Sequence, residues 1–305
     1  ISQEDIRLYP EIHSLRQKLG SHLSIDGENI LLFSGSTLGI KQFMDNFCIP
    51  GKHVVLSKNC FPLHFIFPQI QNTNIEYVMH DVIESTDVKL KMKINLPNLL
   101  EKIDENTCCI CLANPNSPIG DILTLNEIES ILKKSSLYRI PVLIDEAYIE
   151  FSNADSSISL IHKYDNLVVS RTFSKGLGCA GLRCGYLATN SKIVESLKKI
   201  AYPMEISHLA AKFCSQLLDE YQIVTDYTSS IRKERETIFD MLKEHKMKYL
   251  ECQLNTIHIQ PNHIENLFGY LKTINVRCKL RTIEGEVYLA LSLFESFHKS
   301  NVFKI

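Results

Sequence analysis

Ser170-Arg-Thr-Phe-Ser-Lys175, continued by Gly181-Leu-Arg-Cys-Gly185, follows directly on the apolar run Leu-Val-Val and is the most informative stretch of this chain. Such a run indicates a buried strand, so the lysine comes just after the strand's carboxyl end, with the hydroxyls of Thr172 and Ser174 beside it. A lysine amine can form a Schiff base with an aldehyde, while hydroxyls and an arginine, here Arg183, can bind a dianionic phosphate. The stretch therefore predicts a site for a phosphorylated aldehyde cofactor, for which pyridoxal 5'-phosphate (PLP) is the obvious candidate.

A second strand-like run, Val142-Leu-Ile144, ends in Asp145-Glu-Ala-Tyr148. Most lysines are only solvated surface charges, so the interpretation of Lys175 depends on motifs of this kind. A carboxylate at the carboxyl end of a parallel strand, Asp145, can hold a protonated pyridine nitrogen, and the Tyr148 phenol can donate to the ring's 3-oxygen. The carboxylate keeps the ring cationic, and a cationic ring withdraws electrons from the substrate's α-carbon. Asp145 and Tyr148 are therefore predicted to be catalytic together with Lys175.

Two upstream segments also place loops at the ends of apolar runs. Residues 108–112 open into Asn114-Pro-Asn-Ser-Pro-Ile-Gly120, in which two prolines and a glycine fix a rigid turn. Residues 30–33 run into Ser34-Gly-Ser-Thr-Leu-Gly-Ile40 and then into a helical pattern. A small-residue loop that enters a helix presents backbone N–H groups and the positive end of the helix dipole to a phosphate. The second loop is therefore predicted to contribute to the phosphate site.

These four segments, in this order along the chain, resemble the fold-type I PLP-dependent aminotransferases of class I/II, and most closely the histidinol-phosphate aminotransferase branch. Asn114–Gly120 is similar to that family's Asn-Pro-Asn-Asn-Pro-Thr-Gly turn, and Ile144–Tyr148 is similar to its aspartate strand. Ser170–Gly185 is similar to its lysine and phosphate-arginine segment. Single motifs are weak signals, but four in the correct order are hard to obtain by chance.

The resemblance implies a role for each matching residue. Lys175 would form the Schiff base with the cofactor, Asp145 would bind the pyridine nitrogen, and Tyr148 would bind the 3-oxygen. The cofactor's phosphate would be held by hydroxyl, backbone and guanidinium groups of Arg183, Ser174, Thr172, Ser36 and Thr37.

Two aromatic residues also match family positions. Phe61, in the sequence Asn-Cys-Phe-Pro, matches the ring that stacks on the cofactor, with ordinary core packing as the alternative. Tyr9, followed by Pro10, matches a tyrosine that reaches the phosphate bound by the neighbouring subunit, with an exposed terminal tyrosine as the alternative. The resemblance therefore implies a homodimer with shared active sites.

The chain departs from the family in three places. Ser117 stands where an asparagine amide usually donates to the 3-oxygen, so that contact passes through water, is made by Asn116, or is weaker. Tyr288 aligns with the arginine that binds the substrate carboxylate, and the nearest arginines are Arg277 and Arg281. The family's Asn-Glu-Asn-Pro segment near the start is missing, so we expect a fragment or a processed chain.

Composition limits the class of protein. The 305 residues are 45% hydrophobic and 22% charged, with a net charge of −2. This balance predicts a large core and argues against nucleic acid or a membrane as the main partner. No apolar run in the sequence approaches the roughly 20 residues of a membrane span. Ten cysteines in a chain of this length favour a reduced, cytoplasmic protein over a disulfide scaffold.

The cysteines at 108, 109 and 111 raise the question of a metal site. Adjacent residues on a strand point to opposite faces, and no second Cys/His pair has zinc spacing, so we interpret these cysteines as small buried hydrophobic residues. The 11 histidines are scattered, and none is assigned a catalytic role. We therefore predict no metal site.

Strand-like runs alternate with stretches long enough for crossover helices, which predicts an α/β fold with a mostly parallel, doubly wound sheet. From about residue 191 the chain is helical, and its last segment has the pattern of short strands around one helix. We expect a large PLP-binding domain at 29–220 and a smaller α+β C-terminal domain at 221–305. The N-terminal segment, 1–28, would pack on the small domain or on the partner subunit.

The sequence thus predicts a PLP-dependent aminotransferase. Its substrates would be an amino donor, either an amino acid or a phosphorylated amino alcohol such as histidinol phosphate, and a 2-oxo acid. Two alternatives stay open, namely decarboxylation of a phospho-amino acid on the same scaffold and a non-catalytic PLP-binding relative. The cofactor residues do not separate these reactions, because reaction choice depends on which substrate bond lies perpendicular to the ring.

Overall fold

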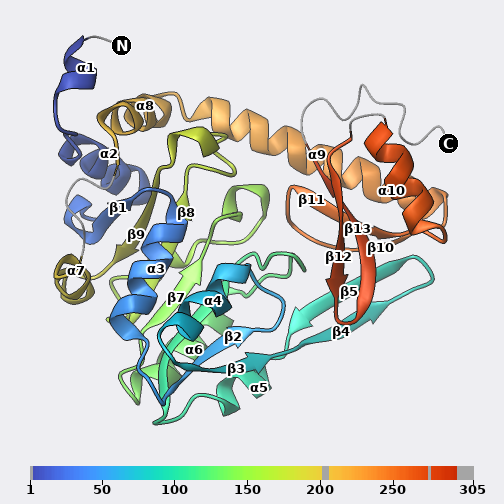
Figure 1. Cartoon of the computed structure of the whole chain (residues 1–305), viewed down its shortest axis with the longest axis horizontal. Helices are drawn as coiled ribbons and strands as arrows, with labels where there is room; N and C mark the ends of the chain where they lie inside the picture. The colour runs from blue at the N-terminus through green and yellow to red at the C-terminus, as the bar shows by residue number, and fades with distance from the viewer. Residues whose placement is uncertain (1–2, 201–205, 274–275, 294–305) are drawn as a thin grey trace.

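The computed structural model describes residues 3–200, 206–273 and 276–293, which form two β-sheets with helices around them (Figure 1). Residues 1–2, at the start of the predicted N-terminal segment, and residues 294–305, at the end of the predicted C-terminal domain, lie outside the described residues. The α-helices are α1 (Gln3–Arg7), α2 (His13–Leu23), α3 (Ser36–Phe47), α4 (Pro62–Ile70), α5 (Leu96–Glu101), α6 (Leu125–Ser136), α7 (Ser191–Lys198), α8 (His208–Asp219), α9 (Gln222–Glu244) and α10 (Ile264–Thr273). None of the helices in the described ranges is long and apolar enough to cross a membrane.

The larger sheet has seven strands in the order β1-β9-β8-β7-β6-β2-β3. Its strands are β1 (Ile30–Phe33), β2 (His53–Ser57), β3 (Asn74–Val78), β6 (Thr107–Ala113), β7 (Val142–Asp145), β8 (Leu167–Thr172) and β9 (Gly185–Thr189). The pairs from β8 through β3 are parallel, whereas β9 runs antiparallel to both β1 and β8. The prediction of an α/β fold with a mostly parallel sheet is confirmed.

Both faces of this sheet are covered, which explains why its strands are almost uniformly apolar. On one face, Ile128 and Ile131 of α6 share a buried cluster with Ile110 of β6. On the other face, Phe43 and Met44 of α3 pack into a second buried cluster that also contains residues of β2 and β6. A strand buried on both faces ends at an edge of the sheet, so its last residue is the first one able to reach a ligand.

The smaller sheet has six strands in the order β12-β13-β11-β10-β5-β4. Its strands are β4 (His80–Ser85), β5 (Lys89–Ile94), β10 (Lys248–Leu250), β11 (Thr256–Gln260), β12 (Cys278–Ile283) and β13 (Glu286–Ser292). The parallel pair of β5 with β10 joins a hairpin from the middle of the chain to the C-terminal strands. Strands from both predicted ranges, 29–220 and 221–305, therefore build one sheet, and these domain limits stay a prediction.

Two helices pack on the smaller sheet and give it a core of its own. Helix α9, the long helix across the top of Figure 1, reaches from the region of α8 to this sheet. Phe239 of α9 stacks on Tyr249 of β10 with ring centroids 4.8 Å apart, and Leu271 of α10 is buried in the same cluster. This packing fixes the position of the smaller sheet relative to α9.

The described part of the N-terminal segment packs beside the larger sheet. Helix α2 contacts α8 and β1, and its Leu15 and Leu19 are each only 1% exposed within the core beneath the larger sheet. This arrangement differs from the expectation that residues 1–28 pack on the small domain. Contact with a partner subunit stays a prediction for α1 and the residues around it.

A β-bulge at the amino end of β6 changes the orientation of two cysteines. Thr107 pairs with His53, but Cys109 pairs with the very next residue of β2, so Cys108 is the extra residue. The bulge interrupts the alternation of side chains, and the Sγ atoms of Cys48, Cys108 and Cys109 lie within 4.8 Å of one another. The premise that Cys108 and Cys109 point to opposite faces is wrong. All three thiols are buried, as expected for hydrophobic packing, and the absence of a metal there stays a prediction.

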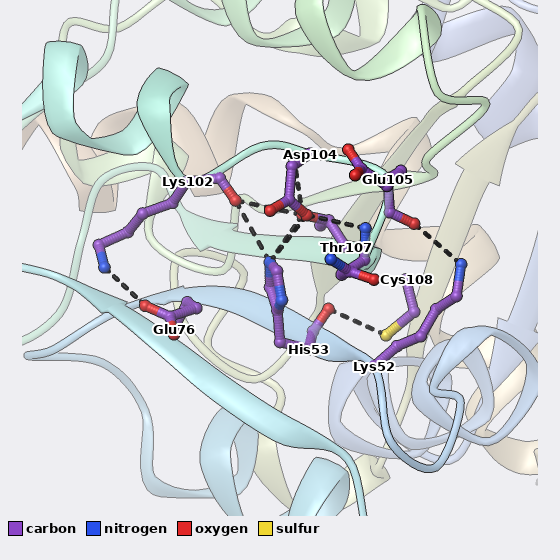
Figure 2. A network of polar contacts seen from close by, with 9 residues as sticks. Lys52, His53, Glu76, Lys102, Asp104, Glu105, Thr107 and Cys108 are labelled. Atoms are coloured by element: carbon purple, nitrogen blue, oxygen red, sulfur yellow. Dashed lines mark hydrogen bonds and ion pairs between the residues drawn. The ribbon is translucent and has the colours of Figure 1, made fainter.

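Polar groups around this bulge bond to one another, as Figure 2 shows. His53 Nε2 lies 2.8 Å from Thr107 Oγ1 and 3.2 Å from the carbonyl oxygen of Lys102. The Asp104 N–H donates to Thr107 Oγ1 at 3.1 Å, and Lys102 Nζ donates to a Glu76 carboxylate oxygen at 2.6 Å. The polar groups of this network therefore have partners within the protein.

Candidate active site

A cavity of about 660 Å³ opens at the opposite edge of the larger sheet. The last residues of three neighbouring strands, Ala113 of β6, Asp145 of β7 and Thr172 of β8, line it. In open α/β sheets, ligands bind in the crevice outside the carboxyl ends of the strands, and this cavity lies there. Of the residues predicted for the site, the cavity brings together Ser36, Thr37, Phe61, Ser117, Asp145, Tyr148, Thr172, Ser174, Lys175 and Arg183.

Asp145 has one carboxylate oxygen with a partner and one without. The residue is 5% exposed, and its Oδ2 lies 3.2 Å from Nε2 of the fully buried His64. Its Oδ1 is buried and has no hydrogen-bond partner among the described residues. A buried, unpaired carboxylate oxygen is costly unless a ligand donates to it. A protonated pyridine nitrogen is such a donor, so this oxygen fits the predicted role.

His64, which contacts Asp145, was not among the site residues predicted from the sequence. It lies in the first turn of α4, and its ring meets that of Phe61 edge-on, with centroids 5.7 Å apart and planes at 87°. One helix therefore places an aromatic ring in the cavity and an imidazole against Asp145. The separation of three residues between Phe61 and His64 is the only local signal of this pairing, because the carboxylate lies far away in the sequence.

Lys175 lies beyond the end of β8 in a short turn that is closed by a hydrogen bond from the Gly178 N–H to the Lys175 carbonyl oxygen at 2.9 Å. Its Nζ is 5.1 Å from the centroid of the Tyr148 ring. The next residue must be glycine, because a Cβ on Gly176 would come within 2.5 Å of the Glu150 Cβ. The turn thus holds an amine, a phenol and the Asp145 carboxylate around one cavity, as the chemistry of an aldehyde cofactor requires.

A second group of donors converges at the N-terminus of α3. Arg183 Nη1 donates to Ser174 Oγ at 3.2 Å, and Ser36 begins the helix. A Cβ on Gly35, whose φ is +83°, would lie 2.4 Å from Arg183 Nη2, so glycine lets the guanidinium approach the helix terminus. A guanidinium, hydroxyls and the N–H groups of a helix N-terminus together form a site suited to a phosphate. The Thr172 hydroxyl braces this loop by accepting the Ser174 N–H at 3.1 Å.

The smaller sheet contributes two cations that face the same cavity. Lys279 and Arg281 of β12 both line it, and they also line an adjoining, more open cavity of about 970 Å³ that includes Arg277. Tyr288, which the sequence alignment placed at the carboxylate-binding position, is instead 4% exposed and packs among Met92, Ile119, Leu250 and Ile283. Arg281 is its direct neighbour across the β12–β13 pair.

Two predicted residues do not line the cavity. The Asn116 amide donates to Ser57 Oγ and to the Asn59 carbonyl oxygen, at 3.3 and 2.9 Å, so it fixes the turn below the site. Of the two candidates for contact with the 3-oxygen, Ser117 is the one in the cavity. Tyr9 is 82% exposed and lies between α1 and α2.

Comparisons with known proteins agree with this chemistry. A family model described as aminotransferase class I and II matches residues 1–267. A histidinol-phosphate aminotransferase of Francisella philomiragia is 33% identical over 93% of this chain and 78% of that protein. The histidinol-phosphate aminotransferase of Staphylococcus haemolyticus is 29% identical over 96% of this chain and 81% of that protein.

Solved structures show the same fold. The histidinol-phosphate aminotransferase of Clostridium acetobutylicum matches with a TM-score of 0.84 at 19% identity, over 98% of this chain and 90% of that one. The enzyme of Sinorhizobium meliloti, solved in complex with PLP, matches with a TM-score of 0.80 at 19% identity, over 95% and 79% of the two chains. The chain therefore belongs to the aminotransferase class I and II family, and it is a PLP-dependent aminotransferase of fold type I.

Proposed function

We propose that this enzyme transfers an amino group between a phosphorylated amino alcohol or an amino acid and a 2-oxo acid, with histidinol phosphate as the first donor to test. The observation that carries the proposal is the unpartnered Oδ1 of Asp145 in the cavity that also holds Lys175 and Arg183. The similarity to histidinol-phosphate aminotransferases at 29% and 33% identity supports the choice of donor.

PLP, when bound, supplies an electron sink for the bond that breaks at the substrate's α-carbon. In our proposal Asp145 Oδ1 would accept a hydrogen bond from the protonated ring nitrogen and so favour its protonated form, while His64 holds the other carboxylate oxygen in place. Lys175 Nζ would carry a proton to and from the substrate, because Lys175 lines the cavity. The Tyr148 hydroxyl, which belongs to a residue lining the same cavity, would donate to the ring's 3-oxygen.

The phosphate of the cofactor would lie at the N-terminus of α3. There the side chains of Arg183 and Ser174 and the backbone at Ser36 and Thr37 would bind it, and the Thr172 hydroxyl would keep the loop in shape. Phe61 lines the cavity beside Asp145 and is 39% exposed, so its ring is available to cover the cofactor. Ordinary core packing would bury that ring more fully.

The test uses the purified enzyme and a panel of amino acids and phospho-amines. Borohydride reduction should trap the cofactor on the peptide that contains Lys175. Histidinol phosphate should convert the bound cofactor to its amine form without release of CO2, and a 2-oxo acid should reverse the change. Release of CO2 would identify a decarboxylase, and no spectral change with any donor would contradict the proposal.

A homodimer with shared sites is the second part of the proposal. The 82% exposure of Tyr9 on its own chain supports this part of the proposal, because an exposed tyrosine is available to a neighbouring subunit. Chains that carry Tyr9→Ala and chains that carry Lys175→Ala should form mixed dimers in which one site keeps both groups. Those dimers should exceed both parents in activity, whereas full activity of a monomer would contradict sharing.

We also propose a cellular compartment for the enzyme. All ten cysteines of the chain are free in the structure, and seven of them are buried. Free thiols in this number are typical of a reducing compartment, so we propose that the enzyme works in the cytoplasm.

A further inference from the structure

Three cysteine side chains converge at a place that the active site does not use. The Sγ atoms of Cys48, Cys108 and Cys109 all lie within 4.8 Å of one another, and those of Cys48 and Cys109 are 3.9 Å apart. A metal ion that binds three sulfurs at about 2.3 Å in one plane keeps those sulfurs about 4 Å apart. The three thiols are therefore spaced as the ligands of one metal ion.

The bulge in β6 brings the two consecutive cysteines to the same place. In a regular strand Cys108 and Cys109 would point to opposite faces, and the sequence-based prediction of no metal site depended on that geometry. Because Cys108 is the extra residue of the bulge, both Sγ atoms lie near Cys48, which is the C-cap residue of α3. The structure therefore removes the reason for predicting no metal at this cluster.

The ligand atoms of the cluster are sulfurs. The group contains thiols without an imidazole or a carboxylate, and Sδ of Met44, one turn earlier on α3, adds a thioether 3.6 Å from Cys48 Sγ. Thiolates and thioethers select soft ions such as Cu(I). Structural Zn(II) sites take four ligands from cysteine, histidine and carboxylate side chains, a set that the described residues do not complete here. The chemistry of the donors therefore favours Cu(I).

The position of the cluster suits a cation. Cys48 lies at the C-terminus of α3, where unpaired carbonyl groups and the negative end of the helix dipole lie. The His53 carbonyl oxygen, which accepts the Cys108 S–H at 3.2 Å (Figure 2), adds a second negative partial charge. Cys48 and Cys108 are 9% and 7% exposed, so these ligand atoms lie just below the surface, within reach of a small ion.

We propose that Cys48, Cys108 and Cys109 form a trigonal site for one Cu(I) ion. Binding forms sulfur–copper bonds and breaks S–H bonds, whose protons pass to the solvent, and no atom changes its oxidation state. The site lies at the amino end of β6, whereas the cavity with Lys175 lies at the opposite edge of the sheet, so the ion takes no part in amino transfer. It would link the end of α3 to β6 and thereby stabilise the folded chain.

The first test is an anaerobic titration of the holoenzyme with Cu(I) in competition with the chelator bicinchoninate. Wild type should bind one Cu(I) per chain and develop a sulfur-to-copper charge-transfer band in the ultraviolet. Cys48→Ala and Cys109→Ala should each lower the affinity by more than about 100-fold, because losing an outer-shell partner of a metal already costs roughly 10- to 100-fold. Cys278→Ala, at a half-buried thiol of β12, is the matched control and should bind as wild type does.

The second test needs no substitution, so it decides the proposal even if a cysteine variant fails to fold. X-ray absorption of wild type loaded with one equivalent of Cu(I) should show a first shell of three sulfurs. Thermal unfolding should show a higher Tm with Cu(I) than without it, because an ion that binds the folded chain stabilises that state. Where the variants fold, Cu(I) should raise the Tm of Cys278→Ala but not that of Cys109→Ala.

Three results would overturn the site. The first is that bicinchoninate removes all Cu(I) from wild type, so that the chain has no tight site. The second is a first shell that contains nitrogen or oxygen. The third is that folded Cys48→Ala and Cys109→Ala bind Cu(I) as tightly as wild type does. None of these results bears on the proposed amino transfer, which is tested by the reaction of the bound cofactor with amino donors.

Discussion

The network around the bulge in β6 and the cavity at the opposite edge of the larger sheet differ in how their polar groups are satisfied. At the amino edge, His53, Thr107, Asp104 and Lys102 bond to one another around the bulge in β6 (Figure 2). At the carboxyl edge, Asp145 has a buried oxygen for which the described ranges of the chain offer no partner. Buried polar groups are normally paired, so an unpaired one in a cavity indicates a missing ligand rather than a structural role. The network around the bulge therefore stabilises the fold, whereas the cavity at the carboxyl edge is organised for chemistry.

The largest effect should come from Lys175. In the proposed mechanism Lys175 is both the point of covalent attachment and the proton carrier, so Lys175→Ala should lower kcat by about 10⁴ or more, while the free energy of unfolding changes little. Steady-state kinetics and urea unfolding of the same preparation would test both statements. Lys133→Ala, on the exposed side of α6, is the matched control and should retain wild-type activity. Activity within ten-fold of wild type for Lys175→Ala would place the chemistry elsewhere.

Asp145 and His64 should show a graded effect at the same edge. Asp145→Ala should lower kcat/KM by about 10²- to 10³-fold, and more than Asp145→Glu, because the charge opposite the ring nitrogen is lost. His64→Phe keeps the packing but removes the bond to Oδ2, so we expect a smaller loss. Its diagnostic readout is a shifted pH titration of the bound cofactor's absorbance. Equal losses for Asp145→Ala and Asp145→Glu would show that geometry rather than charge matters there.

His258 should make stability depend on pH. Burial, followed by the charges of Arg281 and Lys279, lowers its pKa from 6.5 to about 3 in the folded chain. Below pH 6.5 the unfolded chain therefore binds a proton that the folded chain does not, and stability should fall as the pH decreases toward 3. The slope for one group is at most about 1.4 kcal/mol per pH unit.

Urea unfolding between pH 7 and pH 4 in phosphate-free buffer, compared with His258→Phe, measures this contribution. The variant should lose less stability than wild type over that range. Identical pH profiles would contradict this prediction, because they would show that the pKa of His258 is the same in the folded and unfolded chains.

The smallest effect should come from the amino edge. Thr107→Val keeps the shape of the side chain but removes the hydroxyl that joins His53 and Asp104, which should cost about 1–2 kcal/mol of unfolding free energy. Activity should stay within two-fold of wild type, because this network does not reach the cavity. A large loss of activity with unchanged stability would reverse the contrast between the two edges.

Much of the architecture could be predicted from local patterns. Apolar runs of three to five residues lie within the strands of the larger sheet, for example residues 108–112 in β6 (Thr107–Ala113) and residues 142–144 in β7 (Val142–Asp145). The helix predicted after the loop at residues 34–40 is α3, which begins at Ser36. These elements were predictable because burial on both faces demands apolar residues without interruption. The mixed composition of β4 and β5 gave no such signal, and their membership of the smaller sheet depends on pairing with a strand more than a hundred residues away.

For the site, the sequence by itself determined which residues follow the strand ends, and hence that Asp145, Lys175 and Arg183 lie at one edge. Tertiary structure alone decided that His64 meets Asp145, that Tyr288 is buried, and that Lys279 and Arg281 face the cavity. The physical reason is the range of the interactions. A residue at a strand end is placed by its own strand, whereas a contact between sheets depends on how separate elements pack and pair, which local patterns do not encode.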